Sequence, residues 1–179
     1  KRVDDVLSGK KEELLWILEH ETVYTGGTSS NKKDIINKKI KIVDSKRGGK
    51  YTVHSPGQKI VYFVIDLNKR GKDIRKFINK IENCIINILK EYNINSEADK
   101  KNIGIWINNK KIASIGVRVK KWIAYHGFSI NVCNDLIKFK SIIPCGIKNK
   151  GVTSLKEIGV KNYNNINDVI SNQFLKIFD

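Results

Sequence analysis

A cysteine in the stretch IIPCGI, residues 142–147, is the side chain in this sequence best placed to do chemistry. Cys145 stands between Pro144 and Gly146, directly after an apolar run. Proline lacks a backbone N–H and glycine reaches backbone angles that other residues avoid, so we expect the chain to turn here. A turn can expose a thiol, and a thiolate is a nucleophile. By position alone, Cys145 is either a reactive cysteine or an ordinary turn residue.

Neither of the other two cysteines is expected at a turn that could expose it. Cys84 falls beside a stripe of apolar residues at helical spacing in DIRKFINKIENCIINILKEY, and we expect it to be a small core residue. Cys133 ends the alternating run FSINVC, on the face opposite Phe128 and Ile130. Three cysteines without paired spacing indicate neither a disulfide framework nor a zinc site, and we expect no metal.

A lysine at the start of KIASIGVRVK is a candidate base. The run alternates as a strand does, with Ala113, Ile115, Val117 and Val119 on one face. Lys111 has the same parity, so its side chain is expected to point towards the core. Two interpretations stay open. The ammonium either reaches water near the preceding turn, or it is partly desolvated and serves as a base.

The apolar pattern predicts the elements that position these residues. We expect a strand at 13–20 leading into a glycine-marked loop at 21–27, a short strand at 40–43, a glycine- and proline-rich loop at 47–58, a buried strand at 59–67, a helix at 73–92, a hairpin at 103–122 turning at 108–110, a strand at 125–132 and a terminal helix at 167–178. These predict a single domain, residues 1–179, of mixed α/β (α+β) class. It is built around one largely antiparallel sheet flanked by helices.

The net charge of +16, from 34 basic and 18 acidic residues, favours anionic partners. The basic residues are nearly all lysines scattered along the chain, whereas base-edge recognition depends on arginine. No basic stripe is interleaved with aromatic residues, so we expect a solvated lysine-rich surface and no nucleic-acid partner. An acidic protein partner stays open.

No apolar run approaches the length that spans a bilayer, and no signal-peptide pattern opens the chain. We therefore expect no membrane partner and a cytoplasmic location. An organellar location is the alternative if a targeting segment was lost with a trimmed amino terminus, because methionine is absent throughout.

Four motifs occur in the order, and at roughly the spacing, of lipoate biosynthesis octanoyltransferases of the LipB type. They are RGGKYTVHSPGQ, KIASIGVRV, YHGFSINV and IIPCGI, and the chain resembles this family from about residue 14 to about residue 160. Ser55 stands where the family usually has glycine, and Lys46 stands where it has an acidic residue. The family's amino-terminal helix looks truncated. The resemblance implies the catalytic fold of biotin and lipoate protein ligases.

The resemblance also implies a reaction. Enzymes of this family move an octanoyl group from octanoyl-acyl carrier protein to a lysine of lipoyl domains through a cysteine thioester. The matching positions are Cys145 as nucleophile and Lys111 as the residue that favours the thiolate and takes the amine's proton. The implied acceptors are the lipoyl domains of 2-oxoacid dehydrogenase complexes and the glycine cleavage H protein. No cofactor is expected.

The acyl site that the resemblance implies consists of three segments. Its residues are Arg47, Gly48, Gly49, Lys50, Tyr51, Thr52, Val53 and His54, then Ser114, Ile115 and Gly116, then Gly127, Phe128 and Ser129. We expect backbone N–H groups from these segments to hold the thioester oxygen. For His54 and His126 we favour local hydrogen bonding over catalysis, and we expect His20 to be structural.

Two other functions stay open. An ATP-dependent lipoate or biotin protein ligase shares this fold and a related glycine loop, but it activates a free acid as an adenylate and does not need the Pro-Cys-Gly cysteine. A lysine-rich nucleic-acid-binding domain without catalysis is the more distant alternative, and it predicts binding that weakens steeply with salt.

Overall fold

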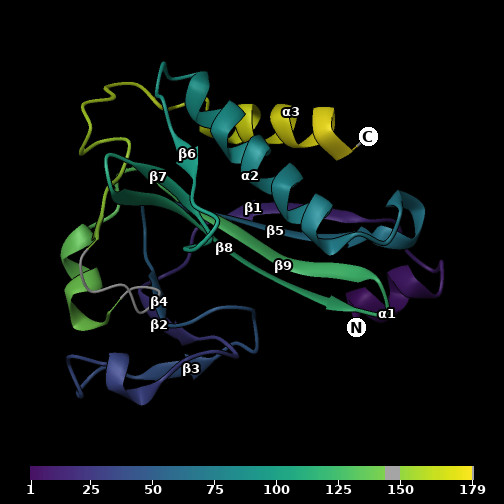
Figure 1. Cartoon of the computed structure of the whole chain (residues 1–179), viewed down its shortest axis with the longest axis horizontal. Helices are drawn as coiled ribbons and strands as arrows, with labels where there is room; N and C mark the ends of the chain where they lie inside the picture. The colour runs from purple at the N-terminus through teal and green to yellow at the C-terminus, as the bar shows by residue number, and fades with distance from the viewer. Residues whose placement is uncertain (144–149, 179) are drawn as a thin grey trace.

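The structure is a computed structural model, and it describes residues 1–143 and 150–178. Figure 1 shows three layers: two long helices over one face of a large sheet, and a small sheet on the other side. The expected class, a mixed and largely antiparallel sheet with helices, is confirmed. The expectation of a single sheet is wrong, because the strands form two.

The large sheet has the strand order β1-β5-β9-β8-β7-β6, with β10 beside β8. The bounds are β1 Leu14–Leu18, β5 Gln58–Asp66, β6 Glu97–Ala98, β7 Ile105–Ile107, β8 Lys110–Lys120, β9 Ile123–Asn131 and β10 Gly151–Val152. All neighbouring pairs are antiparallel except β10 with β8, which is parallel. The predicted hairpin is confirmed. Asn108 and Asn109 both have positive φ, as a tight two-residue hairpin turn requires.

The small sheet has the order β3-β2-β4, with bounds β2 Val23–Gly26, β3 Ile42–Asp44 and β4 Thr52–His54. Two expected loops therefore contain strands: β2 lies in 21–27 and β4 lies in 47–58. All three residues of β4 are buried, and β4 pairs with β2 in the antiparallel sense. Pairing with a distant partner thus overrides the local turn signals of the glycine- and proline-rich segment.

The helices are α1 Arg2–Leu7, α2 Ile74–Lys90 and α3 Ile166–Phe178, with 3-10 turns η1 Lys32–Asp34, η2 Leu67–Arg70 and η3 Leu136–Ser141. The Asp73 side chain caps α2 by accepting a hydrogen bond from the Lys76 N–H. The predicted apolar stripe faces the sheet, and the buried residues of this helix are Phe77, Ile81, Cys84, Ile85, Ile88 and Leu89. The expected core position of Cys84 is confirmed. Within the described residues, no helix is long and apolar enough to cross a membrane.

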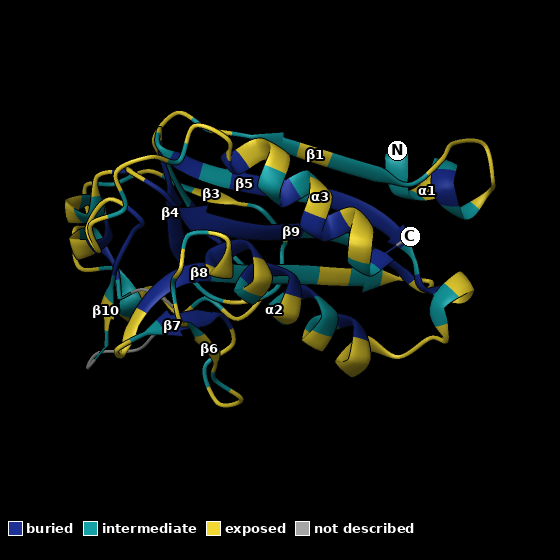
Figure 2. Cartoon of the chain, turned by 90° about the horizontal axis from the view of Figure 1, so that it is seen from above, coloured by how far each residue is buried: buried dark blue, intermediate teal, exposed yellow. Residues whose placement is uncertain are grey.

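The main core lies between the large sheet and the two long helices. Figure 2 shows β5 and β9 buried along most of their length beneath α2 and α3, whose outer sides are exposed. Phe63 of β5 packs between the helices, with ring centroids 5.6 Å from Phe77 and 5.7 Å from Phe174. This layer holds one face of the large sheet rigid and leaves the opposite face for the small sheet.

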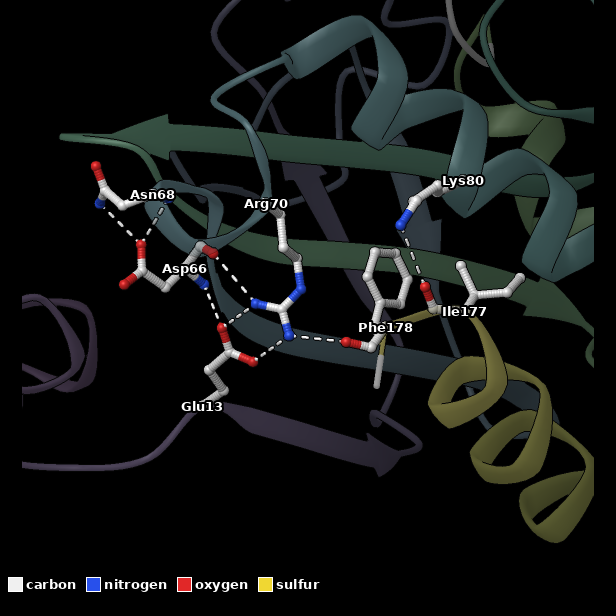
Figure 3. A network of polar contacts seen from close by, with 7 residues as sticks. All are labelled: Glu13, Asp66, Asn68, Arg70, Lys80, Ile177 and Phe178. Atoms are coloured by element: carbon white, nitrogen blue, oxygen red, sulfur yellow. Dashed lines mark hydrogen bonds and ion pairs between the residues drawn. The ribbon is translucent and has the colours of Figure 1, made fainter.

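Arg70 joins three distant parts of the chain at one end of the large sheet, as Figure 3 shows. Its guanidinium binds both carboxylate oxygens of Glu13 at 2.6 and 2.9 Å, and it donates to the carbonyl oxygens of Asp66 and Phe178. Bidentate, charge-assisted pairs are among the stronger hydrogen bonds in proteins. The contact fixes the start of β1 and the end of α3 relative to β5.

Candidate active site

A cavity of about 390 Å³ opens where the two sheets face each other. Its wall comes from all three strands of the small sheet and from β5, β8 and β9 of the large sheet. The wall is largely apolar, and Val23, Ile60, Ile115 and Phe128 are among the residues that line it. The volume falls in the range typical of small-molecule sites, and the apolar wall suits an aliphatic chain.

The structure brings together most of the site residues expected from the sequence. Those in the cavity wall are Arg47, Gly49, Lys50, Tyr51, Thr52, His54, Ser114, Ile115, Gly116, Gly127, Phe128 and Ser129. Gly48 and Val53 are not in the wall. Gly48 lies so close to β8 that an added Cβ would stand 2.5 Å from the Val117 carbonyl oxygen, and Val53 is buried. That these residues bind an acyl chain stays a prediction.

The cavity wall also contains residues that were not among those expected to form the acyl site. They are His20, Glu21, Val23, Thr25, Val43, Ser45, Ile60, Tyr62, Ile103 and His126. The alternation of β5 held a signal for two of them, because Ile60 and Tyr62 lie on the face opposite Val61 and Phe63, which pack under the helices. Val23, Thr25 and Val43 belong to the small sheet, whose pairing sequence patterns do not reveal.

Arg47 ties the glycine loop to β2. Its Nη2 donates to the carbonyl oxygen and the Oγ1 of Thr25, both at 3.0 Å, and its Nη1 donates to the Gly48 carbonyl oxygen at 3.0 Å. The guanidinium therefore places a fixed positive charge in the cavity wall. Burial lowers the pKa of the His126 imidazole, and the Arg47 charge lowers it further.

His54 ends a chain of buried hydrogen bonds that fixes its proton. The Asn131 Nδ2 donates to the Thr153 carbonyl oxygen, so the Asn131 Oδ1 is left to accept from the Gln58 Nε2 at 2.7 Å. The Gln58 Oε1 can only accept, so the His54 Nδ1, 2.7 Å away, donates to it. The local hydrogen bonding expected for His54 is present. Because Nδ1 is engaged, Nε2 is the ring nitrogen left for a ligand.

His20 and Tyr62 form a second polar contact in the wall. The His20 Nε2 lies 2.8 Å from the Tyr62 hydroxyl oxygen, and the rings of His20 and His54 lie 5.9 Å apart. This contact joins the end of β1 to β5 and agrees with the structural role expected for His20.

The backbone at 126–127 has an unusual conformation. His126 has φ 68°, which is uncommon for a residue other than glycine, and it lies inside strand β9. A Cβ on the neighbouring Gly127 would overlap the Val61 carbonyl oxygen of β5. The position therefore requires glycine, and strained backbone of this kind tends to occur at functional sites.

Lys111 is buried, with only 4 % of its surface exposed. Its Nζ donates to the Ile103 carbonyl oxygen at 2.8 Å and lies 4.7 Å from the centroid of the Trp106 ring. The inward direction expected from strand parity is confirmed, and the alternative in which the ammonium reaches water is wrong. Ile103 is itself part of the cavity wall. The ammonium is thus held directly behind that wall.

Cys145 lies outside the described residues, but the chain on both sides of residues 144–149 is described. Before them, the Ile143 N–H donates to the Asp34 carbonyl oxygen. After them, β10 pairs with β8 so that Val152 is opposite Lys111. The strand that follows the Pro-Cys-Gly motif therefore runs beside Lys111. No cluster of metal-binding side chains occurs in the described part of the chain.

Comparison with known proteins places these features in context. The family described as the lipoyl protein ligase A/B catalytic domain matches residues 2–176. An octanoyltransferase of Wolbachia sp. subsp. Brugia malayi is 43% identical over 99% of this chain and 90% of its own length. An octanoyltransferase of Zymomonas mobilis is 42% identical over 90% of this chain and 77% of its own length.

Solved structures show the same fold at low sequence identity. A bipartite lipoate protein ligase from Thermoplasma acidophilum, described with its E2 lipoyl domain, superposes with a TM-score of 0.75 at 14% identity. The superposition covers 98% of this chain and 76% of that one.

Proposed function

The chain belongs to the lipoyl protein ligase A/B catalytic domain family and is an acyltransferase that transfers octanoyl groups in protein lipoylation, and from this premise we propose its donor, its acceptor and its covalent intermediate. The donor is octanoyl-acyl carrier protein. The acceptors are lysines on the lipoyl domains of 2-oxoacid dehydrogenase complexes and on the glycine cleavage H protein. The cytoplasm is the proposed location.

We propose that the reaction proceeds in two steps through Cys145. The Cys145 thiolate attacks the thioester carbonyl of the donor, the carrier's thiolate leaves, and the octanoyl group remains on the enzyme as a new thioester. The uncharged ε-amine of the acceptor lysine then attacks this thioester. An amide forms, and the Cys145 sulfur leaves. The proton lost by the amine passes to that sulfur, or to Lys111, whose ammonium gives its own proton to the carrier's thiolate in the first step.

The observation that supports this proposal is the apolar cavity with Lys111 held behind its wall. The cavity suits an eight-carbon chain, and the three segments expected to form the acyl site contribute to it. The Lys111 ammonium is bound to the carbonyl of a wall residue and lies on the strand that pairs with β10. A nearby cation favours the thiolate over the thiol. The sequence motif supplies the thiol at Cys145.

The first experiment locates the covalent intermediate. The enzyme is incubated with octanoyl-acyl carrier protein, and its intact mass is measured. We expect the mass to increase by one octanoyl group in the wild type and in Cys84→Ala and Cys133→Ala, and not in Cys145→Ala. An octanoyl adduct that survives in Cys145→Ala and disappears in another cysteine variant would refute the assignment. Transfer from free octanoate and ATP, retained in Cys145→Ala, would instead indicate a ligase.

The second experiment tests Lys111 with a matched neighbour. Lys111→Met removes the ammonium and keeps the length of the side chain, whereas Lys110→Met makes the same change at the exposed adjacent residue. We expect Lys111→Met to slow both acylation of the enzyme and transfer to a lipoyl domain, with acylation recovering more than transfer at high pH. Near-normal rates in Lys111→Met would show that Lys111 has no part in the reaction.

A further inference from the structure

One short segment carries a large share of the chain's positive charge. Residues 31–50 contain eight basic side chains and two acidic ones, a net charge of +6, whereas the whole chain of 179 residues carries +16. The basic residues of this segment, which we call the basic rim, are Lys32, Lys33, Lys38, Lys39, Lys41, Lys46, Arg47 and Lys50. If the charge were evenly distributed, these 20 residues would carry a net charge of about +2. The sequence pattern alone suggested scattered lysines, and only the fold gives their grouping a location.

One end of the basic rim contributes to the cavity wall. Strand β3 is an edge strand of the small sheet, and Val43 in its centre is 45 % exposed and also contributes to the cavity wall. Arg47 and Lys50, further along the same segment, are in the wall as well. Figure 1 shows this segment on the side of the large sheet opposite α2 and α3. A partner that binds here therefore stands next to the cavity.

The rim lysines keep their charge available to a partner. In the described part of the chain, no carboxylate lies within 4.0 Å of the ammonium groups of the lysines at 32–50. All of these lysines except Lys50 are exposed. Ile36, on the same segment, is 61 % exposed and adds apolar surface beside the charges. Apolar contact surrounded by uncompensated charge is typical of a protein-binding surface.

Resting on the proposed function, we propose that the basic rim is the docking surface for the donor, an acidic carrier protein that presents its acyl thioester on a phosphopantetheine arm. The carrier's carboxylates face the exposed lysines at 32–46. The arm carries a phosphodiester between the carrier and the thioester, and this anion passes Arg47 and Lys50 as the acyl chain enters the cavity. The acceptor fits this surface less well, because the group that it inserts is a lysine, which is a cation in water.

The test compares two variants of equal net charge. Lys39→Glu/Lys41→Glu reverses two exposed rim lysines that precede β3, and Arg75→Glu/Lys76→Glu reverses two exposed residues in the first turn of α2, on the opposite side of the large sheet. Each pair of reversals lowers the net charge from +16 to +12. Two donors are used: octanoyl-acyl carrier protein and the octanoyl thioester of N-acetylcysteamine, which is small and uncharged. The measured quantity is the second-order rate constant for acylation of the enzyme at low ionic strength.

We expect the rim variant to be acylated by the carrier protein about 10-fold more slowly than the wild type, because electrostatic steering raises association rates by 10-fold or more. The α2 variant should change much less, and both variants should react normally with the small thioester. Equal slowing of the two variants would show that net charge acts without a defined surface, and an unchanged rim variant would also overturn the proposal.

Two further outcomes separate the alternatives. If the rim variant is acylated normally by the carrier but transfers slowly to a lipoyl domain, the rim binds the acceptor, and the proposal is wrong. If the rim variant reacts slowly with the small thioester too, the mutations have altered the cavity, which also contradicts docking. Failure of the wild-type enzyme to be acylated by either donor would overturn the proposed function itself.

Discussion

We expect His54 to lower the stability of the folded protein in acid. We expect His54→Gln to remove most of this pH-dependent loss of stability. Burial lowers the pKa of His54 from 6.5 to about 4, the hydrogen bond to Gln58 opposes this change, and the charge of Arg47 adds to it. The unfolded chain keeps the ordinary imidazole pKa. The glutamine variant removes the titrating ring, and its amide can still donate a hydrogen bond to the Gln58 Oε1.

The sign and the size follow from proton linkage. Between about pH 6.5 and about pH 4 the unfolded state binds a proton at this residue and the folded state does not, so the free energy of unfolding falls as pH falls. The contribution of uncharged His54 to the free energy of unfolding is fully present above about pH 6.5 and is lost as the pH approaches 4. A pKa difference of about 2.5 units corresponds to about 3 kcal/mol, since one unit is worth about 1.4 kcal/mol. A loss of this size is large beside the 5–15 kcal/mol typical of a whole domain.

The assay is urea unfolding of the wild type and His54→Gln at several pH values between about 7 and about 4. We expect the wild type to lose about 3 kcal/mol more than the variant across this range. The slope that remains in the variant includes His126, whose pKa is also lowered, chiefly by burial. Equal pH dependence in the two proteins would refute the reasoning. Nitrogen NMR gives an independent check, because a proton on the His54 Nε2 would contradict the hydrogen-bond chain through Gln58.

Two other substitutions and one labelling experiment test the buried parts of the structure. Asn131→Leu removes the acceptor of the Gln58 amide inside the protein, and we expect a loss of about 2–4 kcal/mol in urea unfolding; a loss below about 1 kcal/mol would contradict it. Gly127→Ala forces a Cβ against the Val61 carbonyl oxygen, and we expect it to lower the free energy of unfolding by at least about 2 kcal/mol. An unchanged urea midpoint would instead show that β5 and β9 separate easily. Burial raises the pKa of the Cys84 thiol to about 12, so at neutral pH iodoacetamide should label Cys84 only after unfolding, and labelling of the native protein at Cys84 would show that α2 opens.

Sequence patterns predict the parts of this fold whose signals are local and strong. The apolar stripe of α2 repeats over seventeen residues, and Asp73 marks the start of the helix. The alternation in β8 and the Asn108-Asn109 turn predict the β7–β8 hairpin, because both signals are read within one stretch of chain. Element type and face were therefore predictable in these stretches.

The small sheet and the cavity could not be predicted in this way. Strands β2 and β4 have four and three residues, too few for a period to stand out, and β4 lies among the turn residues of the glycine loop. What makes them strands is pairing between residues about thirty positions apart. The cavity depends on that pairing, because its wall forms only when the small sheet faces β5, β8 and β9. The motif resemblance identified three segments of this wall, and the fold supplied the rest.

Lys111 shows why strand parity alone could not separate its two interpretations. Parity gives the direction of a side chain, whereas the fate of a buried charge depends on the partners that it meets. Those partners, the Ile103 carbonyl and the Trp106 ring, lie before the hairpin turn, and they reach Lys111 only because β7 folds back on β8. Burying an ammonium, even one with partners, costs desolvation that an apolar side chain of similar length avoids. Stability alone therefore gives no reason for a lysine at this position. The proposed role of Lys111 in the reaction gives one, and this proposal predicts that activity responds more strongly than stability when the ammonium is removed.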